Sequence, residues 1–191
     1  MTLPMVLTWG RIAIAPVFFA FYQLSGARAP MLLIGVWVIF VLIEVSDLLD
    51  GHFARLLRLE SELGKVLDPF ADALSRLTYF IAFAGSGILP LWILLILVYR
   101  DLSVAYIRVI VSREKVLMSA RVSGKLKAWV YAVAGIAGIG VYSLQSTGWF
   151  SAALPVVSAV AYVIFVASAA VAVWSLADYL LFFRKKFGKT S

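Results

Sequence analysis

The sequence predicts an all-α integral membrane protein, a bundle of six transmembrane helices. Three observations predict it: 63% of the residues are hydrophobic, only 14% are charged, and the mean hydropathy is +1.00. Soluble domains average about 45–50% apolar and about 25% charged residues. The 191 residues have room for about six spans of some 20 residues each. We therefore expect one membrane domain that covers residues 1–191.

Glycine, proline and charged residues divide the chain into six apolar stretches, each long enough to cross a bilayer as a helix. In chain order the expected spans are residues 3–24, closed by Ser25-Gly26; 30–50, closed by the charged segment after Gly51; 65–86, closed by Gly85-Ser86-Gly87; 89–111, closed by the basic segment after Ser112; 125–145, closed by Gln145-Ser146-Thr147-Gly148; and 151–183. In the fifth span, Ala134 and Gly138 have the small-xxx-small spacing that lets helices approach closely, so we interpret them as packing residues.

The basic residues predict the orientation in the membrane. Arg28 alone falls in a loop on one side, and the other side holds Arg55, Arg58, Lys65, Arg113, Lys115, Arg121, Lys125, Lys127, Arg184, Lys185, Lys186 and Lys189. Because Lys and Arg are enriched in cytoplasmic loops, both termini are expected in the cytoplasm. The net charge of +7 is then explained by topology and anionic lipid, so no nucleic-acid partner is expected.

Composition also limits the chemistry that the chain can perform. It has no cysteine and a single histidine, His52. Disulfides, thiolate catalysis, sulfur-ligated metals and histidine clusters are therefore excluded. Oxygen ligands and oxygen nucleophiles remain.

Four aspartates form the most informative pattern, D-x2-D-G-x2-A-R-x8-G-x3-D-x3-D, between Asp47 and Asp72. In helices, Asp47 and Asp50 lie at i, i+3 and Asp68 and Asp72 at i, i+4, so each pair shares one face. An ionised carboxylate at the bilayer centre costs about 2.5–3.5 kcal/mol. A compensating cation is therefore expected.

A helical hairpin of the second and third spans would bring the four carboxylates together. Two divalent ions would keep all four ionised. All-oxygen ligation favours Mg²⁺ or Mn²⁺ over zinc or copper, with calcium left open. Two such ions suit displacement at the phosphorus of a diphosphate, and a carboxylate not saturated by metal could accept the proton of an attacking hydroxyl.

The aspartates have two possible roles other than catalysis. The aspartates could pair with cations such as Arg55, Arg58 and Lys65, but few cations lie at a matching depth. They could line a cation or proton pathway, but they cluster near one face and no inverted repeat is evident. Arg76 follows Asp72 by one turn and is expected either to pair with that carboxylate or to touch substrate.

The pattern resembles the signature of the CDP-alcohol phosphotransferase family, membrane enzymes of phospholipid synthesis, and every fixed position is met. The resemblance implies six transmembrane helices, usually in a homodimer, and a cavity open to the cytoplasm and to lipid. It also implies two divalent ions on Asp47, Asp50, Asp68 and Asp72, with Asp72 as general base. For the cytidine nucleotide and its diphosphate it implies Gly51, Ala54, Arg55 and Gly64, together with Arg11 in Pro4-x3-Thr8-x2-Arg11.

A second segment resembles bacterial phosphatidylglycerophosphate synthases. Those enzymes carry an Arg-Glu, a later Arg and a Gly-Lys-x-Lys stretch, and this chain has Arg100-Asp101, Arg108 and Gly124-Lys125-Leu126-Lys127. Asp101 stands in place of the Glu, and Ala128-Trp129-Val130-Tyr131 follows where those enzymes usually have Thr and then Gln. Arg108, Lys125 and Lys127 could hold the phosphate of an acceptor alcohol.

The expected activity is metal-dependent transfer of a phosphatidyl group from CDP-diacylglycerol to glycerol 3-phosphate, giving phosphatidylglycerophosphate and CMP. Inositol phosphate, serine or a lipid alcohol stay open as acceptors within the same reaction class. The alternative that is not an enzyme is a cation or proton transporter in the cell membrane.

Overall fold

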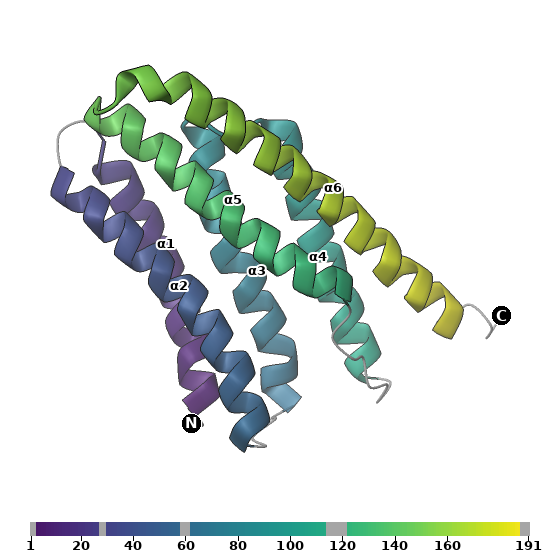
Figure 1. Cartoon of the computed structure of the whole chain (residues 1–191). Coiled ribbons are helices and arrows are strands. Elements are labelled where there is room, and N and C mark those ends of the chain that lie inside the picture. Colours follow the sequence, from purple (N-terminus) through teal and green to yellow (C-terminus); the bar gives the residue numbers. More distant parts are fainter. Residues whose placement is uncertain (1–2, 27–29, 58–61, 114–121, 188–191) are drawn as a thin grey trace.

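The protein is described by a computed structural model that covers residues 3–26, 30–57, 62–113 and 122–187. Within these ranges the regular structure is entirely helical, which confirms the predicted all-α class (Figure 1). The elements are α1 (Leu3–Leu24), α2 (Pro30–Leu57), α3 (Glu62–Gly85), α4 (Leu91–Arg113), α5 (Val122–Thr147), the 3₁₀ helix η1 (Ser151–Ala153) and α6 (Leu154–Phe187).

Helix α2 runs further than the sequence pattern predicted. We expected the charged segment after Gly51 to end the second span, but the helix continues to Leu57. Alanine, leucine and arginine fill much of this extension, and all three are good helix formers. Asp47 therefore lies well inside a helix and not at its end.

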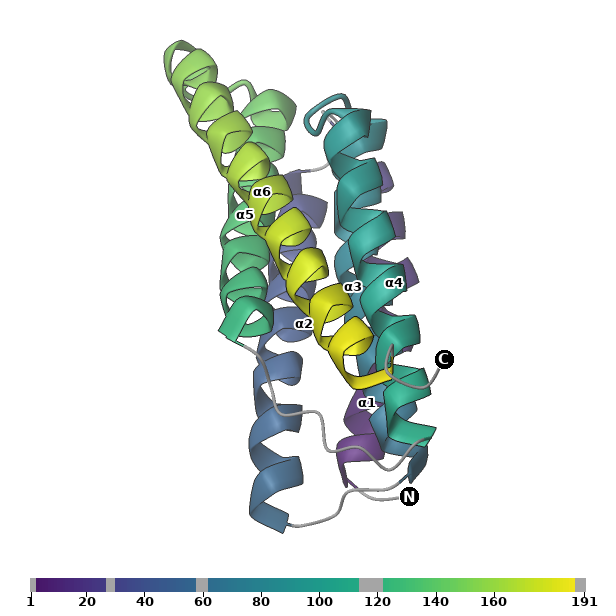
Figure 2. The same cartoon turned by 90° about the vertical axis from the view of Figure 1, so that its right-hand side faces the viewer.

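The helices form a bundle in which α1 packs against both α2 and α3, and α5 packs against α6. Helix α4 packs against both α3 and α6, and α5 also contacts α2 and α3. Within the described residues α2 and α3 share little direct contact, and the helix ends that the expected hairpin would bring together have side chains outside the described part of the structure. Figure 2 shows that α1 begins and α6 ends towards the same end of the bundle.

Aromatic side chains fix α3 in the centre of the bundle. Tyr79 makes edge-to-face contacts with Phe18 of α1 (6.3 Å between ring centroids) and with Phe40 of α2 (5.4 Å). Phe80 makes the same kind of contact with Tyr131 of α5, at 5.3 Å. This geometry is the one that aromatic quadrupoles favour. The position of α3 is thereby set against three other helices.

Two glycines of α5 provide the close helix contact that the small residues predicted. A Cβ at Gly135 would lie 2.5 Å from Cε2 of Phe40, and a Cβ at Gly138 would overlap the ring of Phe83. At Gly140 a Cβ would meet no atom within 4 Å. Gly135 and Gly138 therefore let α5 approach the aromatic core, whereas Gly140 does not have this role.

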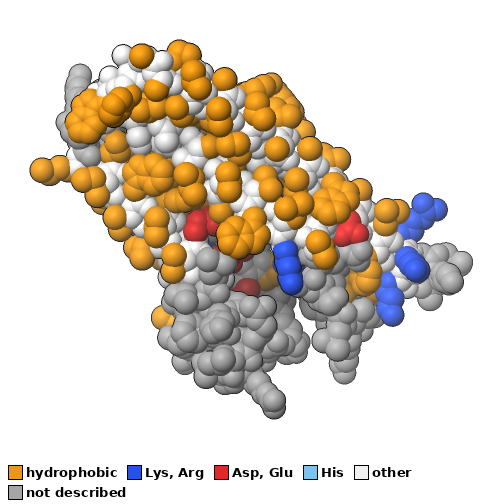
Figure 3. All heavy atoms as spheres, in the orientation of Figure 1, with side chains coloured by type: hydrophobic (Ala, Val, Ile, Leu, Met, Phe, Trp, Pro, Cys, Tyr) orange, Lys and Arg blue, Asp and Glu red, His pale blue; other side chains and the backbone are white. Residues whose placement is uncertain are grey.

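Two helices of the described ranges are long and apolar enough to cross a membrane, Val122–Thr147 and Ser151–Phe187. Only 28% of the most apolar window of the second is buried, unlike the core helix of a soluble protein. Hydrophobic side chains are spread over the described part of the face in Figure 3. The exposed residues Arg184, Lys185 and Lys186 lie at the end of α6. These features indicate association with a membrane.

We expect Gly138→Ala to lower the thermal unfolding temperature of the protein in detergent micelles. The added methyl group would overlap the fully buried ring of Phe83. Overpacking of this kind costs about 1–3 kcal/mol, against a helix-propensity gain of about 1 kcal/mol.

The matched control is Gly140→Ala in the same helix, which gains the propensity without the overlap. Its unfolding temperature should equal or exceed that of the wild type. A Gly138→Ala variant as stable as Gly140→Ala would contradict the packing role.

Candidate active site

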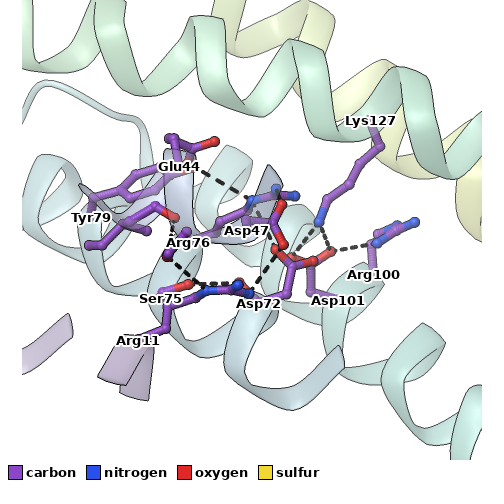
Figure 4. A network of polar contacts seen from close by, with 12 residues as sticks. Arg11, Glu44, Asp47, Asp72, Ser75, Arg76, Tyr79, Arg100, Asp101 and Lys127 are labelled. Atoms are coloured by element: carbon purple, nitrogen blue, oxygen red, sulfur yellow. Dashed lines mark hydrogen bonds and ion pairs between the residues drawn. The ribbon is translucent and has the colours of Figure 1, made fainter. Parts of the chain in front are cut away.

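Charged side chains gather at the end of the bundle where α1 begins and α6 ends. Asp47 comes from the second half of α2, Asp72 from the first half of α3, Asp101 from the middle of α4 and Lys127 from the start of α5, and their side chains lie together (Figure 4). A cavity of about 80 Å³ lies among them, room for several water-sized groups. Its charged lining residues are Asp47, Asp72, Arg76, Arg100, Asp101, Arg108 and Lys127.

Arg76 of α3 joins carboxylates from two helices. Its Nη2 lies 2.6 Å from Oδ2 of Asp47, and its Nε lies 3.1 Å from Oδ1 of Asp72. Oε1 of Glu44 is 4.0 Å from the same Nε. The guanidinium is 3% exposed, so these charge pairs are hardly screened by water. The expected pairing of Arg76 with Asp72 is confirmed.

Helix α1 contributes two further contacts to the aspartates. Arg11 Nη1 donates to Oδ1 of Asp47 at 3.1 Å, and Arg11 Nε donates to Oγ of Ser46 at 3.3 Å. Thr8 Oγ1 donates to Oδ1 of Asp68 at 2.7 Å. Thr8 and Arg11 of the expected N-terminal motif thus both contact aspartates of the pattern. Arg11 and Asp68 are not among the residues that line the cavity.

The carboxylates at the cavity fit a hard divalent cation. Oδ1 of Asp72 is buried and, within the described residues, makes no hydrogen bond, only the ion pair with Arg76. Asp47, from another helix, reaches the same guanidinium. Carboxylate oxygens from two helices thus converge on one positive charge, and one of these oxygens has unused acceptor capacity. Oxygen ligands of this kind suit Mg²⁺ or Mn²⁺. No group of three or more such ligands forms within the described part of the chain.

Five predicted site residues have side chains outside the described part of the structure: Asp50, Gly51, Ala54, Arg55 and Gly64. Their backbones are helical, with the first four on α2 and the last on α3. Asp50 therefore occupies the position one turn after Asp47, as its spacing predicted.

Asp101 of α4 binds two cations and also lines the cavity. Arg100 Nη1 lies 2.8 Å from its Oδ1, and Lys127 Nζ lies 3.1 Å from its Oδ1. All three residues are buried, at 3–5% exposure. One acid between two bases leaves the cluster with a net positive charge, and the whole cluster lines the cavity.

The predicted acceptor-binding residues separate into two groups. Arg108 and Lys127 line the cavity, whereas Lys125 is exposed and is not part of its lining. Positions 125 and 127 point to nearly opposite sides of a helix. Arg108 Nη2 donates to the hydroxyl of Tyr179 at 2.8 Å.

The sequence reasoning missed Glu44 and Tyr179. Glu44 accepts a hydrogen bond from Tyr79 Oη at 3.3 Å and lies close to Arg76. It precedes Asp47 by three residues in an apolar span, so a further acid on the aspartate face was the available signal. Tyr179 gave no signal, because an aromatic residue in an apolar helix is usual.

Comparison with known proteins finds one family and several relatives that match this chain. Residues 1–174 match the family described as CDP-alcohol phosphatidyltransferase. The CDP-diacylglycerol–glycerol-3-phosphate 3-phosphatidyltransferase of Bacillus subtilis (strain 168) is 26% identical over 141 residues, 69% of this chain and 73% of that protein. A "probable phosphatidylglycerophosphate synthase" of Mycobacterium tuberculosis (strain ATCC 25618 / H37Rv) is 33% identical over 156 residues, 82% of this chain and 72% of that protein.

A third relative carries a different name. The cardiolipin synthase (CMP-forming) of Streptomyces coelicolor (strain ATCC BAA-471 / A3(2) / M145) is 35% identical over 101 residues, 53% of this chain and 47% of that protein. The match covers less than half of that relative. The family match ends at residue 174, before Tyr179.

We expect Asp101→Asn to destabilise the protein strongly, because it leaves Arg100 and Lys127 buried without a negative charge. Breaking a buried pair in this way costs about 3–5 kcal/mol. Thermal unfolding in detergent micelles measures the loss.

The double variant Asp101→Asn, Lys127→Met serves as the control, since it restores the original net charge of the cluster. It should recover part of the lost stability. Equal stability of Asp101→Asn and the wild type would contradict the role of Asp101 as a shared counter-ion.

Proposed function

Because the chain belongs to the CDP-alcohol phosphatidyltransferase family and is a phosphatidyltransferase of phospholipid biosynthesis, we propose its substrates and their placement. The donor is CDP-diacylglycerol, the acceptor is glycerol 3-phosphate, and the products are phosphatidylglycerophosphate and CMP. One observation carries this proposal: the cavity is lined by aspartates of the family pattern from α2 and α3, its acidic wall, and by Arg108 and Lys127 from α4 and α5, its basic wall.

The two walls suit the two ends of a phosphorylated alcohol. A phosphomonoester dianion is attracted to Arg108 and to the net positive cluster of Arg100, Asp101 and Lys127. The hydroxyl at the other end of the same small molecule would then face Asp72. The exposed Lys125 would act only at the cavity entrance, by attracting the anion.

Asp72 is proposed as the general base, since its Oδ1 is buried at the cavity and has unused acceptor capacity. It takes the proton of the acceptor hydroxyl while the acceptor oxygen forms a bond to the lipid-side phosphorus of the donor. The bond from that phosphorus to the CMP oxygen breaks, and CMP leaves with its electron pair. Arg76 keeps Asp72 ionised and in place between reactions.

The metal site is proposed to consist of Asp47, Asp50, Asp68 and Asp72, with two Mg²⁺ or Mn²⁺ ions per site. When bound, such ions neutralise the diphosphate and stabilise the leaving oxygen. Among the chain's own contacts, Arg11 orients Asp47 and Thr8 orients Asp68. Arg11 is proposed to reach the donor phosphates from this position.

The donor nucleotide is proposed to lie along the end of α2 and the start of α3. The residues assigned to it are Gly51, Ala54, Arg55 and Gly64, which belong to the family pattern. A glycine lets the backbone approach a ligand closely, and an arginine offers a fork of donors to a phosphate.

For the whole chain we propose one domain, residues 1–191, with six spans and a homodimer in the cell membrane. Each of the six α-helices in the described residues has at least 22 residues, enough for about 30 Å of hydrocarbon. The start of α1, the basic end of α6 and the cavity lie at one end of the bundle. The bias of Lys and Arg towards the cytoplasm puts this end inside the cell.

A second acceptor class has support from one observation, the relative named as a cardiolipin synthase. A lipid alcohol as acceptor would use the same aspartates and release CMP, but it would not need a phosphomonoester site. Inositol phosphate and serine are the other acceptors to compare, and a cation or proton transporter would release no CMP.

We expect the purified full chain in detergent with Mg²⁺ to release CMP from CDP-diacylglycerol with glycerol 3-phosphate as acceptor. Release with inositol phosphate, serine or phosphatidylglycerol should be at least ten times slower, by about 1.4 kcal/mol or more in transition-state free energy. Chromatography of labelled nucleotide measures the release.

Removal of divalent ions with a chelator should stop the release, and Mg²⁺ or Mn²⁺ should restore it. Fast release with another acceptor and none with glycerol 3-phosphate would refute the acceptor and keep the reaction class. Ion flux in liposomes without CMP from any acceptor would refute the enzyme.

We expect Asp72→Asn to lower kcat for CMP release by roughly 10²–10⁴-fold, because the amide cannot accept the acceptor's proton. Asp178→Asn is the matched control, since Asp178 accepts a hydrogen bond from Ser123 at 2.6 Å and does not line the cavity. An amide oxygen can still accept that bond. Wild-type kcat in Asp72→Asn would rule out Asp72 as the base.

A further inference from the structure

Arg108 is held by a single polar partner on another helix. Its Nη2 donates to Tyr179 Oη at 2.8 Å, and its guanidinium carbon lies 5.5 Å from the centre of the same ring. Within the described residues no carboxylate forms an ion pair with Arg108. A guanidinium has five N–H donors, so most of them are left for a ligand in the cavity that Arg108 lines.

The neighbouring Arg100 differs from Arg108 in its hydrogen bonds. Its Nη1 donates to Asp101 and its Nη2 to Ser175 Oγ, both at 2.8 Å, and it is 5% exposed. Protein groups thus use both of its terminal nitrogens. Arg100 is a buried structural cation, whereas Arg108 is partly exposed and oriented by one hydroxyl.

Tyr179 itself is rigidly placed on α6. It is 1% exposed and packs in a small cluster with Val104, Ile107 and Val111 of α4. Ser175, one turn earlier, holds Arg100, and Asp178 accepts a hydrogen bond from Ser123 of α5. The hydroxyl of Tyr179 therefore has a fixed position from which to orient Arg108.

Gly124 of α5 leaves the space that this hydroxyl needs. A Cβ at position 124 would lie 3.1 Å from Tyr179 Oη and 3.8 Å from Arg108 Nη2. A contact of 3.1 Å between a methyl carbon and a hydroxyl oxygen is tight, so a larger residue would press on the pair.

We propose that Tyr179 is a positioning residue for the acceptor: its hydroxyl orients Arg108 so that the remaining guanidinium donors bind the acceptor's phosphomonoester. This inference rests on the proposed function for the identity of the acceptor. It adds a residue outside both the aspartate pattern and the segment that matches the family, residues 1–174.

The test is steady-state kinetics of the full chain with Tyr179→Phe, which keeps the ring and removes the hydroxyl. We expect KM for glycerol 3-phosphate to rise about three- to tenfold, as for the loss of one typical intramolecular hydrogen bond. KM for CDP-diacylglycerol and kcat at saturating acceptor should stay within about twofold, because the hydroxyl acts only on acceptor binding.

A double-mutant cycle separates positioning from general stability. Arg108→Gln should raise KM for the acceptor, and Tyr179→Phe should add nothing in that background, because its effect passes through Arg108. A merely structural role of Tyr179 would lower activity in both backgrounds. The control variant is Tyr131→Phe, whose tyrosine is fully buried with a hydroxyl that makes no hydrogen bond in the described residues.

The outcomes distinguish this inference from the proposed function. Wild-type use of glycerol 3-phosphate with an unchanged KM in Tyr179→Phe overturns the inference alone. If the wild type uses inositol phosphate instead, the proposed acceptor fails, and the same rise in KM for inositol phosphate still supports Tyr179. Use of only unphosphorylated acceptors overturns both. Should Tyr179→Phe not fold, Gly124→Ala displaces the same pair, and a wild-type KM there overturns the inference.

Discussion

The site depends on one buried guanidinium, that of Arg76, which neutralises carboxylates from α2 and α3. Within the described residues these helices share little direct contact, and the ion pair of Arg76 with Asp47 is a polar link between them. Acids buried in an apolar bundle repel one another and lose hydration. A fixed cation offsets this repulsion, and an arginine suits this task because it is always charged and offers several donors.

The bundle places a second charge cluster opposite the first. On the α4 and α5 side, Asp101 is shared by Arg100 and Lys127, so that wall keeps a positive charge. A molecule with an anionic end and a hydroxyl end would be oriented between the two walls. The aromatic contacts of Tyr79 and Phe80 hold α3 against α1, α2 and α5 and so fix the helix that carries Asp72 and Arg76.

Much of this arrangement followed from the sequence. Hydropathy predicted the helices, because each apolar run is long and ends at glycine or charge, and the spacing of the aspartates predicted shared helix faces. The end of α2 was predicted too early, because the charged segment after Gly51 was expected to end the helix. The residues of this segment favour a helix, and α2 continues to Leu57. The contact between Arg108 and Tyr179 was not predictable, because it joins residues 71 positions apart through the packing of α4 on α6. Lys125 and Lys127 looked equivalent as a pair, and only the helical phase of α5 distinguishes them.

The last helix, α6, contributes two residues that contact arginines of α4. Ser175 and Tyr179 lie beyond residue 174, where the family match ends, yet they hold Arg100 and Arg108 of α4. Under the proposed roles of Arg108 and Tyr179, acceptor binding then depends in part on a residue beyond the segment that the family match covers. Changes in the final turns of α6 could retune which alcohol is accepted while every aspartate of the pattern stays in place.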